Sequence, residues 1–208
     1  VTSGKIIVDG EVLREADRPF DEKMYRRFQG SRMSMIFQEP MTSLNPVFTV
    51  GQQIAESLER HEHLNKNDAW KKAEDMLELV GIPRERAIEY PHQFSGGMKQ
   101  RVGIARAYAA DPKLLIMDEP FGQLDAQTRY QMQEEILRIW EKEKRTVIFV
   151  TNNIEEACYL GDRIILLSDC PATVKEVYPI SIPRPRDMVS GEFLKLRTVI
   201  SDNTDLAI

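Results

Sequence analysis

The sequence predicts an α/β fold in which a mainly parallel sheet carries an inserted helical subdomain. Two patterns support this prediction. Short apolar runs, typical of buried strands, alternate along the chain with stretches of helical periodicity, and one long block between two such runs is helical throughout. The chain has 208 residues, of which 42% are hydrophobic and 29% charged, as expected for one large globular domain.

Five segments are predicted to form strands. Lys5–Leu13 has the pattern of two short strands joined at Asp9-Gly10, a dipeptide that favours tight hairpin turns. The other four are compact apolar runs: Met33–Phe37, Lys113–Met117, Thr146–Val150 and Arg163–Leu167. Because Thr146–Val150 is β-branched and apolar, we expect other elements to cover both of its faces.

The helical block runs from Val50 to Tyr90. Its apolar residues recur at three- and four-residue spacing, with Asn67 as the expected N-cap of one helix and Gly81 as its stop. We expect a helical subdomain over roughly residues 42–94 and a C-terminal extension over roughly 180–208. Three further helices are predicted: Ser95–Ala110, Ala126–Lys144 and Ile154–Leu160.

Charge and hydropathy exclude several classes of protein. The net charge of −5 disfavours binding to nucleic acid or anionic lipid through broad electrostatics, so no nucleic-acid partner is expected. No apolar run reaches the length of a membrane span, and Val1–Lys5 lacks the pattern of a signal peptide. The two cysteines, Cys158 and Cys170, follow no metal-ligand spacing and fit a reducing cytosol.

Two acids, Asp118 and Glu119, directly follow the apolar run that ends at Met117. A parallel strand places such residues at its carboxyl end, where ligands bind in open α/β folds. The oxygens of Asp118 suit Mg²⁺, and Glu119 can polarise an attacking water. A helix cap or a surface turn is the alternative, and for these two residues taken alone it is the commoner case.

A serine and two glycines, Ser95, Gly96 and Gly97, open a predicted helix. Exposed N–H groups at the positive end of a helix suit a phosphate group, although a plain N-cap explains these residues equally well. Gln38 ends the predicted strand Met33–Phe37, where its amide can reach a metal ion or a water. For Gln38 in isolation, hydrogen bonding at the end of the strand is the simpler explanation.

Taken together, the order of these motifs resembles that of the ATP-binding-cassette (ABC) ATPases, which have a P-loop NTPase-like core. Phe94–Arg101 is similar to the family's signature sequence, and Leu114–Glu119 resembles its Walker B strand. Leu124-Asp125 resembles its D-loop, and Gln38 falls where the family has its Q-loop glutamine. The resemblance covers nearly the whole chain.

In this family two subunits hold two ATP molecules between them, head to tail. The residues that the resemblance places against ATP at the subunit interface are Ser95, Gly96, Gly97, Gln100 and Asp125. It implies that Asp118 and Gln38 support Mg²⁺ and that Glu119 acts on the attacking water. Gln38 would also link the metal to the transmembrane permease subunits.

The resemblance implies a peripheral subunit at the cytoplasmic face of the cell membrane, where hydrolysis drives solute uptake. Its partners would be permease subunits, a second ATPase subunit in a homo- or heterodimer and, indirectly, an extracytoplasmic solute-binding protein. Ile36–Pro46 is similar to ATPases of oligopeptide and dipeptide importers. Phe149–Ala157 and Ile182–Asp187 are similar to ATPases of nitrate, sulfonate and taurine importers.

The sequence departs from the family at two places. No G-x-x-x-x-G-K-[ST] P-loop is present, because Gly4-Lys5 is followed by Ile6; we expect the chain to be truncated before residue 1. Asn152 stands where the family usually has its switch histidine, and asparagine can hydrogen-bond a phosphate but cannot carry a charge. The alternative function is therefore a non-catalytic, nucleotide-dependent coupling or regulatory module.

Overall fold

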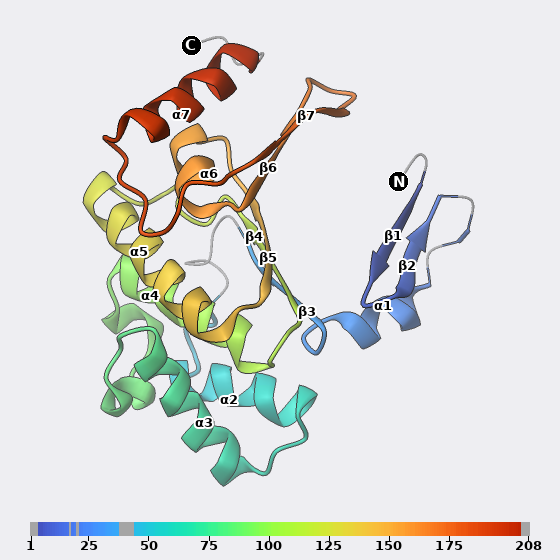
Figure 1. Cartoon of the computed structure of the whole chain (residues 1–208). Coiled ribbons are helices and arrows are strands. Elements are labelled where there is room, and N and C mark those ends of the chain that lie inside the picture. The colour runs from blue at the N-terminus through green and yellow to red at the C-terminus, as the bar shows by residue number, and fades with distance from the viewer. Residues whose placement is uncertain (1–3, 17, 20, 38–43, 205–208) are drawn as a thin grey trace.

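The computed structural model describes residues 4–16, 18–19, 21–37 and 44–204 of the chain (Figure 1). The strands are β1 Lys5–Val8, β2 Glu11–Glu15, β3 Met33–Ile36, β4 Leu114–Asp118, β5 Thr146–Val150, β6 Arg163–Leu167 and β7 Val174–Pro179. The α-helices are α1 Glu22–Phe28, α2 Val50–His61, α3 Lys66–Leu79, α4 Gly96–Ala109, α5 Ala126–Glu143, α6 Ile154–Leu160 and α7 Gly191–Asn203. Two short 3₁₀ helices, η1 Arg84–Ile88 and η2 Pro91–Gln93, lie between α3 and α4.

The central sheet is parallel, as predicted, with the strand order β3-β4-β5. Its register aligns Met35 with Ile116 and Ile116 with Ile148. The remaining strands form two antiparallel hairpins, β1-β2 and β6-β7. Asp9 and Gly10 turn the first hairpin with φ angles of 53° and 79°, the left-handed geometry that a tight hairpin turn requires.

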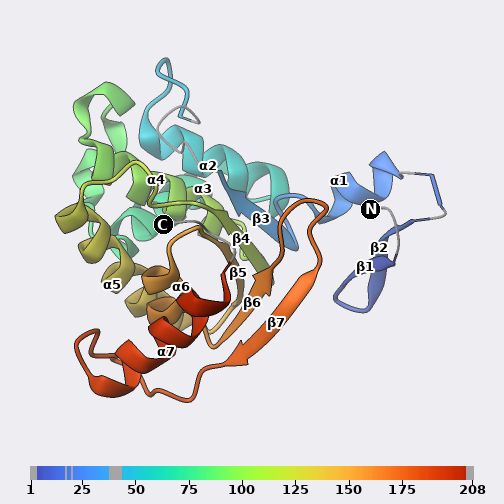
Figure 2. The same cartoon turned by 90° about the horizontal axis from the view of Figure 1, so that it is seen from above.

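Helices cover one face of the parallel sheet. Figures 1 and 2 both show α4, α5 and α6 on the same side of β3, β4 and β5. On the other face Ile148 and Val150 are 49% and 47% exposed, and Met35 is exposed beside them. The expectation that both faces of Thr146–Val150 are covered is therefore wrong for the described part of the chain, because the helices packed there reach only alternate residues of the strand.

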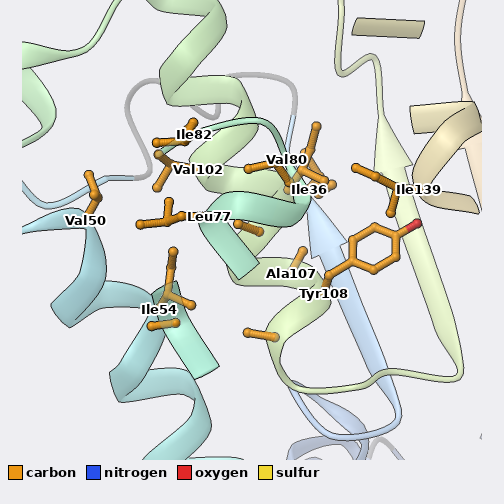
Figure 3. Close-up of a cluster of buried hydrophobic side chains, with 14 of the residues drawn as sticks. Ile36, Val50, Ile54, Leu77, Val80, Ile82, Val102, Ala107, Tyr108 and Ile139 are labelled. Carbon is orange, nitrogen blue, oxygen red and sulfur yellow. The ribbon is translucent and has the colours of Figure 1, made fainter. Parts of the chain in front are cut away.

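The main hydrophobic core joins the sheet to the helical block. Figure 3 shows Ile36 of β3 together with Ile54 of α2, Leu77 of α3 and Val102 of α4. All four side chains are buried, and the same cluster extends to Ile139 of α5. Helices α2 and α3 thus share one continuous core with α4 and the sheet, and α4 packs against β3.

The helical block follows the predicted pattern with one shift. Helix α3 begins two residues earlier than predicted, because Asn65 rather than Asn67 is the N-cap and accepts from the backbone N–H groups of Asn67 and Asp68. Gly81 lies just beyond the helix with a φ of 72°, as expected for the glycine that ends it.

Three elements have no counterpart in the predictions: α1, β7 and α7. Helix α1 lies in a charged stretch and buries only Phe28, against the β1-β2 hairpin. Helix α7 packs Phe193 and Ile200 against Cys158 and Tyr159 of α6 in a second hydrophobic cluster. None of the helices in the described ranges is long and apolar enough to cross a bilayer.

Candidate functional site

The two acids predicted at the strand end lie at the C-terminal end of β4. Asp118 is the last residue of the strand and is aligned with Val150 of β5. The N–H of Glu119 donates a 2.8 Å hydrogen bond to the carbonyl oxygen of Val150. Glu119 has a φ of 40°, a costly conformation for a residue with a side chain, and such strain concentrates at functional sites. The carboxylate of Glu119 is thereby carried at the junction of β4 and β5.

The loop after Glu119 folds back on itself before α5 begins. Gly122 N–H donates to the carbonyl oxygen of Glu119, and Leu124 N–H donates to that of Phe121. Asp125 is the N-cap of α5 and accepts from the backbone N–H of Thr128 at 3.0 Å and from its hydroxyl at 2.7 Å. These two bonds lower the pKa of Asp125 below its ordinary value, since both favour the carboxylate.

The serine and glycines of the predicted phosphate site form the start of α4. Ser95 is its N-cap and accepts from the backbone N–H of Met98, so the simple capping role proposed from the sequence is present. Ser95 is exposed and Gly96 and Gly97 are half-buried, and N–H groups in a first helical turn have no partner within the helix. A Cβ on Gly97 would lie 2.9 Å from Cγ2 of Thr128, so α4 can approach α5 this closely only with a glycine there.

Gln100 is buried one turn further along α4. Its side-chain amide donates a 2.6 Å hydrogen bond to the carbonyl oxygen of Pro120, the residue after Glu119. The amide is therefore used to join α4 to the end of β4, and contact between Gln100 and ATP remains a prediction.

Asn152 follows the C-terminal end of β5 and is exposed. Its neighbours are both fixed: Thr151 donates to the carboxylate of Glu156, and Asn153 is the N-cap of α6. Asn152 also lines an open cavity of about 550 Å³, together with Arg197 and Asp202 of α7.

Two predictions concern the front of the chain. Gln38 lies outside the described residues, so its predicted contacts with metal and permease stay predictions. Lys5 is the first residue of strand β1, in a hairpin, and Gly4 directly precedes it. A phosphate-binding loop instead joins the end of a strand to the start of a helix, so these two residues do not form one.

The carboxylates of Asp118 and Glu119 fit a magnesium ion by their chemistry. Mg²⁺ prefers oxygen ligands and is commonly held by one or two carboxylates, with waters and substrate phosphates completing its shell. Across the described ranges, no group of three or more histidine, cysteine, aspartate or glutamate side chains gathers at one point.

The sequence reasoning missed two charged residues that connect these segments, Arg129 of α5 and Glu156 of α6. Nε of Arg129 lies 3.6 Å from Oε1 of Glu156, whose side chain is only 7% exposed. In sequence, Glu156 is one of two consecutive glutamates at the start of a short helix, which is ordinary helix-end chemistry. No local pattern relates it to an arginine on the preceding helix.

Known proteins match both the sequence and the fold. A family model described as "ABC transporter" matches residues 1–122. The uncharacterized ABC transporter ATP-binding protein MJ0412 of Methanocaldococcus jannaschii is 41% identical over 199 residues, which cover 96% of this chain and 68% of that protein. The aliphatic sulfonates import ATP-binding protein SsuB of Bacillus thuringiensis is 39% identical over 95% of this chain and 70% of its own length.

The oligopeptide transport ATP-binding protein OppD of Bacillus subtilis is 43% identical over 79% of this chain, and the match spans about half (45%) of that relative's length. The fold resembles a dimeric, post-hydrolysis structure of the ATP-binding cassette MJ0796 bound to ADP and Pi. The TM-score is 0.70 and the identity 27%, over 86% of this chain and 74% of that one. With a family model over more than half of its residues, the chain belongs to the ABC transporter family of ATP-binding proteins.

Proposed function

We propose that this chain is the ATP-hydrolysing part of an ABC importer and couples hydrolysis to solute uptake. The observation that carries the proposal is the hydrogen bond from Glu119 N–H to the carbonyl oxygen of Val150. It holds the Asp118–Glu119 pair beside the turn that bears Asn152. Two carboxylates and an exposed amide therefore lie at one edge of the sheet, where ligands bind in open α/β folds.

Each residue then has a role that its chemistry supports. Asp118 would bind Mg²⁺, which when present offsets negative charge on the phosphate oxygens. Glu119 would orient and deprotonate the attacking water, and Asn152 would donate a hydrogen bond to the γ-phosphate. Gln38, which follows β3 in the sequence, would complete the metal site.

A second subunit would complete the nucleotide site. The N–H groups at the start of α4, with Ser95 exposed beside Gly96 and Gly97, suit the γ-phosphate of ATP bound by a second copy or a related subunit. The dimeric cassette with ADP and Pi is a relative in fold and supports this arrangement. OppD is an oligopeptide transport protein and SsuB an aliphatic sulfonates import protein, which supports a role in import. The chain would act at the cytoplasmic face of the cell membrane with permease subunits, and a solute-binding protein on the outer side would deliver the solute.

The test is phosphate release from Mg-ATP by the natural polypeptide that contains this chain. Glu119→Gln keeps the size of the side chain but removes the base, so release is expected to fall by roughly a hundredfold or more while ATP binding persists. Asn152→His adds a group that can carry charge and is expected to raise release. If the natural protein binds ATP but releases phosphate no faster than Glu119→Gln, the non-catalytic coupling module is the better description.

A further inference from the structure

A buried carboxylate lies between the loop 121–125 and the turn that bears Asn152. Glu156 of α6 is 6% exposed, and a carboxylate is rarely buried this far without partners. Its Oε2 accepts a 2.8 Å hydrogen bond from the hydroxyl of Thr151, and its Oε1 faces Nε of Arg129 at 3.6 Å. Figure 1 shows the two helices that carry these residues, α5 and α6, side by side.

On one side, Glu156 fixes the residues that flank Asn152. The Thr151 hydroxyl has a single proton, which it donates to Glu156, and it accepts the N–H of Asn153 at 3.0 Å. The Asn153 side chain in turn accepts the N–H groups of Glu155 and Glu156. The residues on both sides of Asn152 are therefore hydrogen-bonded to Glu156, one to its carboxylate and one to its backbone N–H.

On the other side, Arg129 holds the loop that leads into α5. Its Nη2 donates a 3.0 Å hydrogen bond to the carbonyl oxygen of Leu124, directly before the α5 cap Asp125. One guanidinium group therefore contacts both the loop 121–125 and the carboxylate that fixes Asn152.

The contact between the two charges is longer than a hydrogen bond. Nε of Arg129 is buried and has no hydrogen-bond partner within the described residues, although Glu156 is only 3.6 Å away. An unpaired buried donor is costly, and a shift of a few tenths of an ångström would pair it. A small movement of either side chain would therefore complete a hydrogen bond between Arg129 and Glu156.

We propose that Arg129 and Glu156 are positioning residues that couple the loop 121–125 to Asn152. The inference rests on the proposed function, in which Asn152 faces the γ-phosphate, and on the resemblance that places Asp125 of this loop at the interface with a second subunit. Movement of the loop on dimerisation is transmitted through the guanidinium to Glu156, and through Thr151 and Asn153 to Asn152. The association of two subunits would then also align the side-chain amide of Asn152 with the γ-phosphate.

The neighbouring glutamate provides a matched control. Glu155 also pairs with an arginine, Arg197 of α7, at 3.1 Å, but both side chains are nearly half exposed. An exposed pair of this kind contributes little and contacts neither the loop 121–125 nor Thr151.

The first experiment needs no hydrolysis. Amide hydrogen exchange is measured on the natural protein without nucleotide for Arg129→Gln, Glu156→Gln, Glu155→Gln and Arg197→Gln. Arg129→Gln is expected to accelerate exchange of the Asn153 amide, and Glu156→Gln that of the Leu124 amide, each by roughly tenfold. The two control variants leave exchange over 121–125 unchanged. The coupling is refuted if Arg129→Gln changes exchange only over residues 121–125 and Glu156→Gln changes it only over residues 151–153.

A second experiment examines turnover and also guards against misfolding. Arg129→Lys and Thr151→Val are milder changes: the first keeps the charge but loses the fork that reaches Leu124, and the second removes only the hydroxyl. Both are expected to lower kcat roughly tenfold with little change in the KM for ATP, because they misplace Asn152 without removing a nucleotide contact. If instead the KM for ATP rose roughly tenfold and kcat stayed unchanged, the positioning role would be wrong. If the wild type shows no hydrolysis, the proposed function fails, while the exchange experiment still decides the coupling.

Discussion

The side chain of Gln100 is hydrogen-bonded to the carbonyl oxygen of Pro120 at 2.6 Å. Gln100 belongs to the helix whose first turn carries Ser95, Gly96 and Gly97, and Pro120 directly follows Glu119. One buried bond therefore fixes the helix of the signature sequence relative to the carboxylates at the end of β4. Two segments that the resemblance gives to different nucleotide sites of a dimer are rigidly connected within one chain.

Gln100→Met tests the contribution of this bond to stability. The substitution keeps the length of the side chain but leaves the carbonyl of the buried Pro120 without its partner. We expect the free energy of unfolding to fall by about 1–3 kcal/mol, the usual cost of an unpaired buried polar group. Urea denaturation measures the change. Gln127→Met, at an exposed position of α5, is the control. An equal fall in the free energy of unfolding of both variants would show that the bond from Gln100 to Pro120 does not stabilise the fold.

Gly97→Ala tests the close approach of α4 and α5. Alanine favours a helix by about 1 kcal/mol over glycine, but its Cβ would lie 2.9 Å from the methyl group of Thr128. The contact should outweigh the helix preference, so the variant is expected to be less stable than the wild type. Thr128→Ser removes the methyl group and keeps the hydroxyl that donates to Asp125. The double variant should therefore recover stability, and a double variant no better than Gly97→Ala would contradict this explanation.

The strands and the start of α4 could be predicted because their signals are local. Met33–Ile36, Leu114–Asp118 and Thr146–Val150 are compact apolar runs between polar residues, and Ser95 is a standard N-cap. Helix α1 was missed because it buries little besides Phe28, so its sequence has hardly any apolar periodicity. Two asparagines near the start of α3 can act as its N-cap, so the sequence alone does not separate Asn67 from Asn65, and the backbone geometry selects Asn65.

The candidate site was less predictable than the fold for the same reason. Asp118, Glu119 and Ser95 occur in short motifs that can be recognised in the sequence. The hydrogen bond between Glu119 and Val150, and the contact between Arg129 and Glu156, join residues far apart in the chain. Sequence spacing contains no information about such pairs until the order of strands and helices in space is known.

Arg186 anchors the C-terminal part of the chain to α6. Its buried guanidinium donates to the carbonyl oxygens of Cys158, Tyr159 and Gly161 at the end of that helix, and to that of Ile182. Arg186→Met should lower the free energy of unfolding by about 2–3 kcal/mol, because bonds from a charged donor are strong and several acceptors lose their partner together. Arg197→Met, which loses one exposed pair, should cost less than about 1 kcal/mol. Equal effects of the two substitutions on urea denaturation would contradict this role.

The lowered pKa of the Asp125 carboxyl group should make the stability of the fold depend on pH. Its pKa in the folded protein is below the ordinary value of 3.8, mainly because the Thr128 N–H and hydroxyl bind the carboxylate. A lowered folded pKa contributes stability above the ordinary value, and this contribution is lost as the pH falls from 3.8 through the folded pKa. Asp125→Asn keeps a capping side chain but does not titrate. Between about pH 6 and about pH 3 the urea midpoint of the wild type should therefore fall further than that of the variant. Parallel losses in the two proteins would rule out this contribution.

The two cysteines should react very differently with a thiol reagent. Cys158 is fully buried beneath α7, and burial raises the pKa of its thiol to about 11, whereas Cys170 is exposed. The thiolate is the reactive form, so at about pH 8 iodoacetamide should modify Cys170 alone in the folded protein and both residues in urea. Peptide mass spectrometry locates the adducts, and Arg186→Met provides an internal test. If Arg186 holds the C-terminal part of the chain on α6, its loss should expose Cys158 to the reagent. If Cys158 stays protected in a folded Arg186→Met variant, the apolar contacts of Phe193 and Ile200 are sufficient to hold α7 in place.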